Sequence, residues 1–124
     1  MDVQIETQNV ELPRHSGPSL RGRVHKAMSH VGRHIVRLQL TLRDVNGQKG
    51  GRDKVCTVRA TLAEGGEVVV VDRNHGVRAA LFGALRRTRV VINRELKRRR
   101  RNQRRNRANS NYDELTARMI MESA

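Results

Sequence analysis

Few side chains in this 124-residue sequence have the types and spacing that catalysis or metal binding requires. His30 and His34 are four residues apart, a spacing that suits a metal ion on a helix, but Gly32 lies between them and no third ligand is evident. Cys56 is the only cysteine, which excludes a disulfide scaffold and a cysteine-based zinc site. Because Cys56 falls on the inward side of a predicted strand, we interpret it as a small buried hydrophobic residue rather than a nucleophile.

The remaining candidates for catalysis are equally weak. Glu64 and Glu67 flank a predicted turn, where carboxylates are typically solvated. Residues 47–51 are rich in glycine but lack the Lys-Ser/Thr ending of a phosphate-binding loop, so we interpret them as a hairpin connection. No set of residues resembles a catalytic triad. The sequence therefore predicts a protein that is not an enzyme and that binds no cofactor and no metal.

Charge is the chemical feature that stands out. The chain has 26 Lys and Arg against 12 Asp and Glu, for a net charge of +14. Residues 86–107 contain twelve basic residues and one acid, Glu95, and so carry +11 of that charge. Such a concentration of positive charge attracts polyanions through counterion release, and nucleic acid is the commonest such partner.

Two other interpretations of this charge compete with nucleic-acid binding. A helix that lies on a membrane surface needs a bulky apolar face, and residues 97–107 have none, so we expect no membrane partner. A solubilising tail without a specific partner is the second alternative.

No run of 18 apolar residues occurs, and the start lacks the features of a signal peptide. We therefore expect a cytoplasmic protein without a transmembrane helix.

The elements that must position these charges follow from the hydrophobic pattern. Apolar residues make up 36% and aromatic residues only 2% of the chain, so the core must be aliphatic. Alternating or continuous apolar runs predict four strands, at residues 2–8, 35–45, 55–62 and 67–71. In the second strand we expect four residues on the inward side, namely Val36, Leu38, Leu40 and Leu42. A tight turn at residues 64–66 joins the last two strands.

Helical spacing of apolar residues predicts two helices. The first, of about 14 residues, starts after a cap at Ser16 and ends at Gly32. The second is capped by Asp72 or Asn74. Its expected core stripe is Val77, Ala80, Leu81, Ala84, Leu85, Thr88, Val91, Ile92 and Leu96.

The end of the second helix is left open by the pattern. It either continues through the arginines as a solvated helix or frays near Arg101. From Asn102 onward, repulsion between like charges predicts an extended segment, and Ser110 resembles the start of a capping box for a short terminal helix.

The order of elements predicts an α+β fold of the type β-α-β-β-β-α, with a four-stranded mixed sheet and two helices packed on one face. The crossover through the first helix makes the first two strands parallel, and short turns make the rest antiparallel. We expect residues 1–100 to form this domain. Residues 101–124 are expected to be a basic, flexible tail that can end in a short helix.

Three segments resemble the ribosome hibernation-promoting factor family, also called ribosome-associated inhibitors. Residues 3–12 (VQIETQNVEL) resemble the family's first strand and residues 36–40 (VRLQL) its second. Residues 78–81 (RAAL) sit where the family carries Tyr-Ala-Ala-Ile at the start of its last helix. The resemblance implies a translation inhibitor that occupies the tRNA and mRNA channel of the small ribosomal subunit under stress, through contacts to ribosomal RNA. It implies a monomer away from the ribosome and no small-molecule substrate.

The expected RNA-binding residues combine the family's basic helix positions with the cationic face of the second helix. They are Arg23, Lys26, Arg33, Arg86, Arg87, Arg89, Arg94, Lys97, Arg98, Arg99, Arg100 and Arg101. A general RNA- or DNA-binding protein on the same scaffold, such as a ribosome-assembly or nucleoid factor, is the alternative function. An enzyme that acts on RNA is a third class, which the missing acid–base cluster disfavours.

Overall fold

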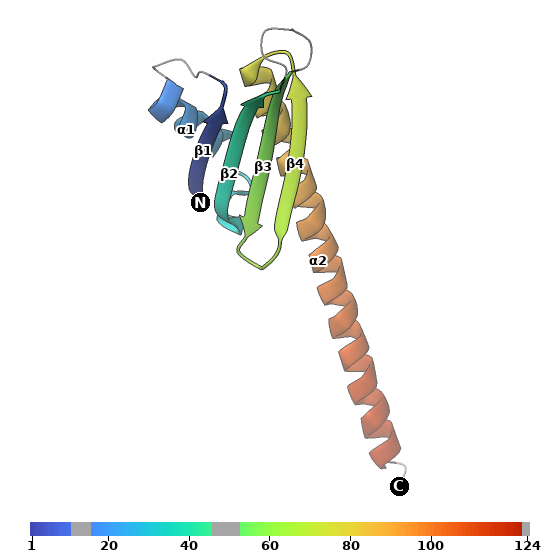
Figure 1. Ribbon diagram of the computed structural model, residues 1–124. Coiled ribbons are helices and arrows are strands. Elements are labelled where there is room, and N and C mark those ends of the chain that lie inside the picture. The colour runs from blue at the N-terminus through green and yellow to red at the C-terminus, as the bar shows by residue number, and fades with distance from the viewer. Residues whose placement is uncertain (11–15, 46–52, 123–124) are drawn as a thin grey trace. The chain divides into compact units, whose positions relative to one another are not determined.

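The computed structural model describes residues 1–10, 16–45 and 53–122 (Figure 1). The predicted hairpin connection at residues 47–51 lies outside these ranges. The chain separates into two compact units, Met1–Ile92 and Asn93–Ala124, which are described separately. Its elements are β1 (Asp2–Gln8), α1 (Ser16–Ala27), the 3₁₀ turn η1 (Gly32–His34), β2 (Ile35–Asp44), β3 (Lys54–Leu62), β4 (Glu67–Asn74) and α2 (Val77–Glu122).

The four strands form one mixed sheet in the order β1-β2-β3-β4. Strand β1 runs parallel to β2, as a crossover through α1 requires, and β2, β3 and β4 pair antiparallel. The predicted α+β fold and its strand directions are confirmed. Gly65 and Gly66 both adopt positive φ angles in the predicted turn between β3 and β4, a conformation that glycine adopts without steric cost.

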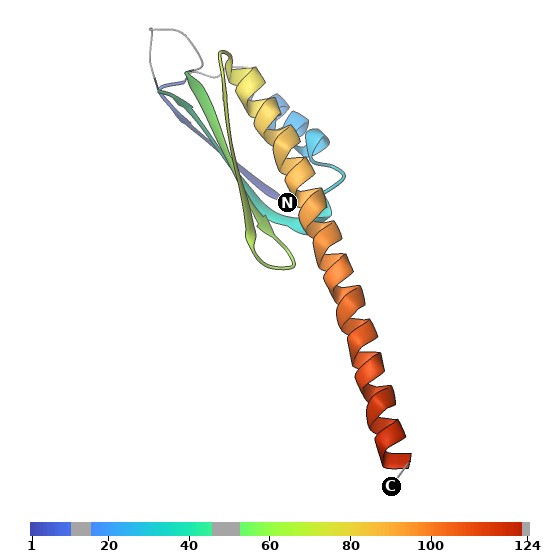
Figure 2. The same ribbon diagram turned by 90° about the vertical axis from the view of Figure 1, so that its right-hand side faces the viewer.

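Two helices cover one face of the sheet. Figure 2 shows α1 and the part of α2 up to Ile92 on the same side. The aliphatic core lies between these layers. It includes Leu38, Leu40 and Leu42 of β2, Val58 and Ala60 of β3, Val24 of α1, Met28 and Val31 just after it, and Leu81, Leu85 and Ile92 of α2.

Two expected core residues are in fact exposed. Val36 is 55% exposed and Ile35 is buried in its place. The cause is an irregularity in the β2–β3 pairing between Ile35 and Arg37, which shifts the alternation at the start of β2. Val91 is also exposed, because it lies one turn after Arg87 on the outer flank of α2 rather than over the sheet.

The ends of the helices differ from the sequence prediction. Helix α1 ends at Ala27, before Gly32. After Ala27 the backbone forms the i to i−3 hydrogen bonds of a 3₁₀ turn, from Ser29 N to Lys26 O (3.3 Å) and from Val31 N to Met28 O (3.1 Å). The predicted caps Asp72 and Asn74 are wrong, since β4 extends to Asn74 and includes both.

The first helical bond of α2 runs instead from Ala80 N to the carbonyl oxygen of Gly76 (3.0 Å). Gly76 therefore stands at the N-cap position of α2. Asn74 still has a local role, because its Oδ1 accepts a hydrogen bond from the backbone N–H of His75 (2.8 Å).

Asp72 is held in a close contact between β4 and α2. A Cβ atom added at Gly83 would collide with the Asp72 carboxylate. Glycine at this position therefore lets the helix approach the end of β4.

Helix α2 continues without a break to Glu122. The predicted extended segment after Asn102, and the separate short helix starting at Ser110, are therefore wrong. Arginine, glutamine and alanine are good helix formers, and neither glycine nor proline occurs after Gly83. Repulsion between like charges at i, i+4 spacing costs only about 0.2–0.5 kcal/mol per pair, so the helix forms in spite of it. Of the helices in the described ranges, none is long and apolar enough to cross a membrane.

Candidate nucleic-acid interface

The first group of predicted RNA-binding residues lies on and just after α1. Arg23 and Lys26 are exposed, on the side opposite the buried Val24 and Met28. Arg33 of η1 is exposed as well, and its Nε donates to Nε2 of His34 (3.2 Å). His34 Nδ1 in turn lies 3.4 Å from Glu64 Oε1, so η1 contacts the turn between β3 and β4. These residues carry cations on the helical side of the sheet, away from its open face.

The second group lies on α2 within the first unit, and the structure separates its three members. Arg86 points away from the core and is exposed, whereas Arg89 is half-buried. Arg87 Nη1 donates to the backbone carbonyl of Val71 (2.9 Å) and lies 3.6 Å from the Asp72 carboxylate. At 100° per residue, Arg87 and Arg89 lie about 160° apart around the helix. Arg87 thus has a structural partner at β4 that the sequence did not predict.

In the second unit, Glu95 binds two of the predicted arginines. Its carboxylate accepts hydrogen bonds from Arg98 Nη2 (2.7 Å), Arg98 Nε (3.1 Å) and Arg99 Nε (3.0 Å). These bonds lower the pKa of Glu95 from 4.5 to about 2 and raise the pKa of Arg98. The i, i+3 and i, i+4 spacings in the sequence were the signal for this cluster.

The lowered pKa of Glu95 gives a pH prediction. Its contribution to stability is present above pH 4.5 and is lost only as the pH falls through about 2. In a ¹³C NMR titration of the side-chain carboxyl, we expect a midpoint near 2. Replacing both partners, in R98Q/R99Q, should return the midpoint toward 4.5. A midpoint near 4.5 in the unaltered chain would show that the cluster does not form in solution.

The other predicted residues of the second unit are exposed and line the helix surface. They are Arg94, Lys97, Arg100 and Arg101. Among the described residues, no carboxylate forms an ion pair with any of these four. Their charges are therefore available to an external anion.

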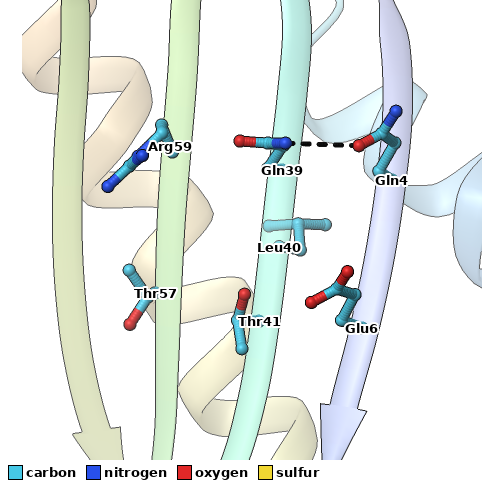
Figure 3. Close-up of a pocket in the computed structure, with 7 residues that line it drawn as sticks. All are labelled: Gln4, Glu6, Gln39, Leu40, Thr41, Thr57 and Arg59. Atoms are coloured by element: carbon cyan, nitrogen blue, oxygen red, sulfur yellow. Dashed lines mark hydrogen bonds between the residues drawn. The ribbon is translucent and has the colours of Figure 1, made fainter.

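A polar hollow lies on the open face of the sheet and was not singled out from the sequence (Figure 3). It has a volume of about 270 Å³. Strand register places its side chains in two rows: Gln4, Gln39 and Arg59, then Glu6, Thr41 and Thr57. Gln39 Nε2 donates to Gln4 Oε1 (3.3 Å), and Arg59 lies 4.0 Å from Glu67. The hollow combines donors and acceptors without a dominant charge.

Cys56 is buried, as predicted, and is not poised to react. Burial raises the pKa of its thiol to about 12, and the nearby Asp72 carboxylate acts in the same direction. The described residues contain no group of three His, Cys, Asp or Glu side chains that could hold a metal ion.

Two solved structures have the same fold as this chain. The N-terminal domain of Protein Y from Thermus thermophilus matches with a TM-score of 0.56 and 17% identity, over 76% of this chain and 98% of that one. A ribosomal subunit interface protein from Coxiella burnetii matches with a TM-score of 0.60 and 12% identity, over 78% of this chain and 99% of that one. No protein-family model and no curated protein matches the sequence. This chain shares the fold of these two proteins, which agrees with the sequence resemblance.

Proposed function

We propose that this protein is a non-enzymatic ribosome-binding factor that inhibits translation by occupying the tRNA and mRNA channel of the small ribosomal subunit. The ligand is ribosomal RNA, the compartment is the cytoplasm, and the free protein is a monomer. A stress response is the setting in which such an inhibitor acts. The observation that carries the proposal is the shared fold with a ribosomal subunit interface protein, together with exposed cations on the helical side of that fold.

The proposed contact residues differ in how freely they can bind phosphate. Arg23, Lys26 and Arg86 are exposed on the first unit, and no carboxylate in the described part of the chain pairs with them. Arg87, Arg98 and Arg99 already have intramolecular partners. An arginine has five N–H donors in a planar fork, so a residue bound on one side can still bind phosphate with the other. Among the predicted residues of the first unit, we therefore assign the larger share of binding to Arg23, Lys26 and Arg86.

Sedimentation with separated ribosomal subunits tests this function, in near-physiological salt and with excess competitor RNA. We expect saturable one-to-one binding to the small subunit. The charge reversal K26E/R86E should weaken that binding on the order of tenfold or more, because two phosphate contacts become repulsive. The matched control R37E/R43E reverses two exposed arginines on the open face of the sheet and should bind normally.

Three outcomes would count against the proposal. Binding to both subunits alike, or loss of binding to the competitor, would indicate a general RNA- or DNA-binding protein. Equal effects of the two charge reversals would show that net charge, rather than the helical side, determines binding. Circular dichroism of both variants confirms that neither has unfolded.

A further inference from the structure

The second unit carries an array of cations more extensive than the predicted site. Beyond the arginines bound to Glu95, seven basic side chains between residues 94 and 107 are exposed: Arg94, Lys97, Arg100, Arg101, Arg104, Arg105 and Arg107. Where side chains are described, no carboxylate pairs with any of the seven. All seven lie in a continuous helix, α2, that ends only at Glu122.

These seven cations occupy one side of the helix. At 100° per residue they fall within an arc of about 160°. The opposite side holds Asn102, Gln103 and Asn106, together with Glu95 and its partner Arg99. Glu95 thus binds both arginines that lie outside the arc, Arg98 just beyond its edge and Arg99 on the opposite side.

Within the arc the cations form three rows along the helix, because residues seven apart lie almost in line. One outer row contains Arg94 and Arg101, with Arg105 beside it. The other contains Arg100 and Arg107, and the middle row contains Lys97 and Arg104. We call these seven residues the basic arc. At 1.5 Å per residue, the arc is about 20 Å long.

We propose that the basic arc is a binding site for double-stranded RNA, with its outer rows on the phosphates of the two strands and its middle row over the minor groove. Two outer rows of cations match two rows of phosphates, and a single strand supplies only one. Single-strand binding also relies on aromatic side chains for base stacking, and residues 93–109 contain none. This proposal depends on the proposed function in one respect only, namely that the ligand is RNA.

The one-sided charge favours an RNA duplex over a DNA duplex. The minor groove of A-form RNA is wide and shallow, and its edges carry 2′-hydroxyls and phosphates, so a helix lying on it is touched on one side. The major groove of B-DNA is roughly 8.5 Å deep and about as wide as a helix with its side chains. A helix inserted there is enclosed around most of its circumference, which would bring the amide-bearing side of α2 near phosphates.

Fluorescence anisotropy with the full chain tests the proposal, with a 20-base-pair RNA duplex, the DNA duplex of the same sequence and the single-stranded RNA as probes. We expect the RNA duplex to bind most tightly. The variant R100Q/R104Q/R107Q should weaken that binding on the order of a hundredfold at 0.15 M salt. It should also reduce the slope of log K against log salt by about three. Glutamine is a good helix former, so circular dichroism should stay unchanged.

The control R37Q/R43Q/R73Q removes the same charge from exposed positions of the sheet and should change binding little. Equal losses in both triple variants, or tightest binding to single-stranded RNA or to DNA, would overturn the proposal. The sedimentation assay separates this site from the proposed function. A chain that binds the small subunit but not the RNA duplex would refute only the site on the basic arc.

Discussion

Leu38→Ala is expected to lower the free energy of unfolding by about 2–5 kcal/mol. Leu38 is fully buried in β2, an inner strand, and its register partners are Val3 of β1 and Ala60 of β3. Urea unfolding followed by circular dichroism measures the change.

Val36→Ala provides the control on the same strand. A strictly alternating strand would bury Val36 beside Leu38, and its truncation would then cost more than 1 kcal/mol. Because Val36 is 55% exposed, we expect a change within about 0.5 kcal/mol. A large loss from Val36→Ala would show that β2 follows the simple alternation after all.

Gly83→Ala and Gly22→Ala are expected to change stability in opposite directions. Alanine replaces glycine inside a helix with a usual gain of about 0.5–1 kcal/mol, and a Cβ at Gly22 meets nothing within 4 Å. At Gly83 the new Cβ would collide with the Asp72 carboxylate, and overpacking of this kind costs about 1–3 kcal/mol. We therefore expect Gly22→Ala to stabilise the protein and Gly83→Ala to destabilise it by about 1 kcal/mol.

The double variant Asp72→Ala/Gly83→Ala tests the cause of this loss. Removing the carboxylate makes room for the Cβ, so the cost of Gly83→Ala should disappear in the Asp72→Ala background. Thermal and urea unfolding of the four chains complete the cycle. A loss of the same size in both backgrounds would show that Asp72 is not the obstacle.

The architecture could be predicted because the information is local. Strict alternation marks β1, the leucines of β2 and the residues of β3, and a short turn with two glycines joins β3 to β4. Helical spacing marks the buried side of α2 up to Ile92. Strand order and direction then follow from the lengths of the connections.

The features that could not be predicted depend on contacts between distant residues or on small differences in energy. The exposure of Val36 comes from the pairing of β2 with β3. The sequence pattern favours Asp72 as a helix cap. Its contact with the Gly83 position depends on how closely α2 approaches β4, which the pattern does not contain. The helix beyond Asn102 reflects a competition between charge repulsion and helix propensity, which a sequence pattern does not resolve.

The structure adds contacts to the predicted site residues, whose role in RNA binding stays a prediction. The basic residues of α1 and α2 follow from charge and spacing together with the family resemblance. The pairing of Arg98 and Arg99 with Glu95 was implicit in the same spacing. The bond from Arg87 to Val71 was not, because it joins residues 16 apart across two elements.

That bond has a consequence for how copies of this protein behave together. Strand β4 is an edge strand with four consecutive valines, of which Val69 and Val71 are about half exposed. An open edge of this composition is a template on which another chain can add a strand, the first step of aggregation. The guanidinium of Arg87 already occupies the carbonyl of Val71, so an incoming strand would lose a backbone partner and meet a positive charge. Arg87, which the sequence analysis assigns to RNA binding, thereby also makes the β4 edge a poorer template for another copy of the chain.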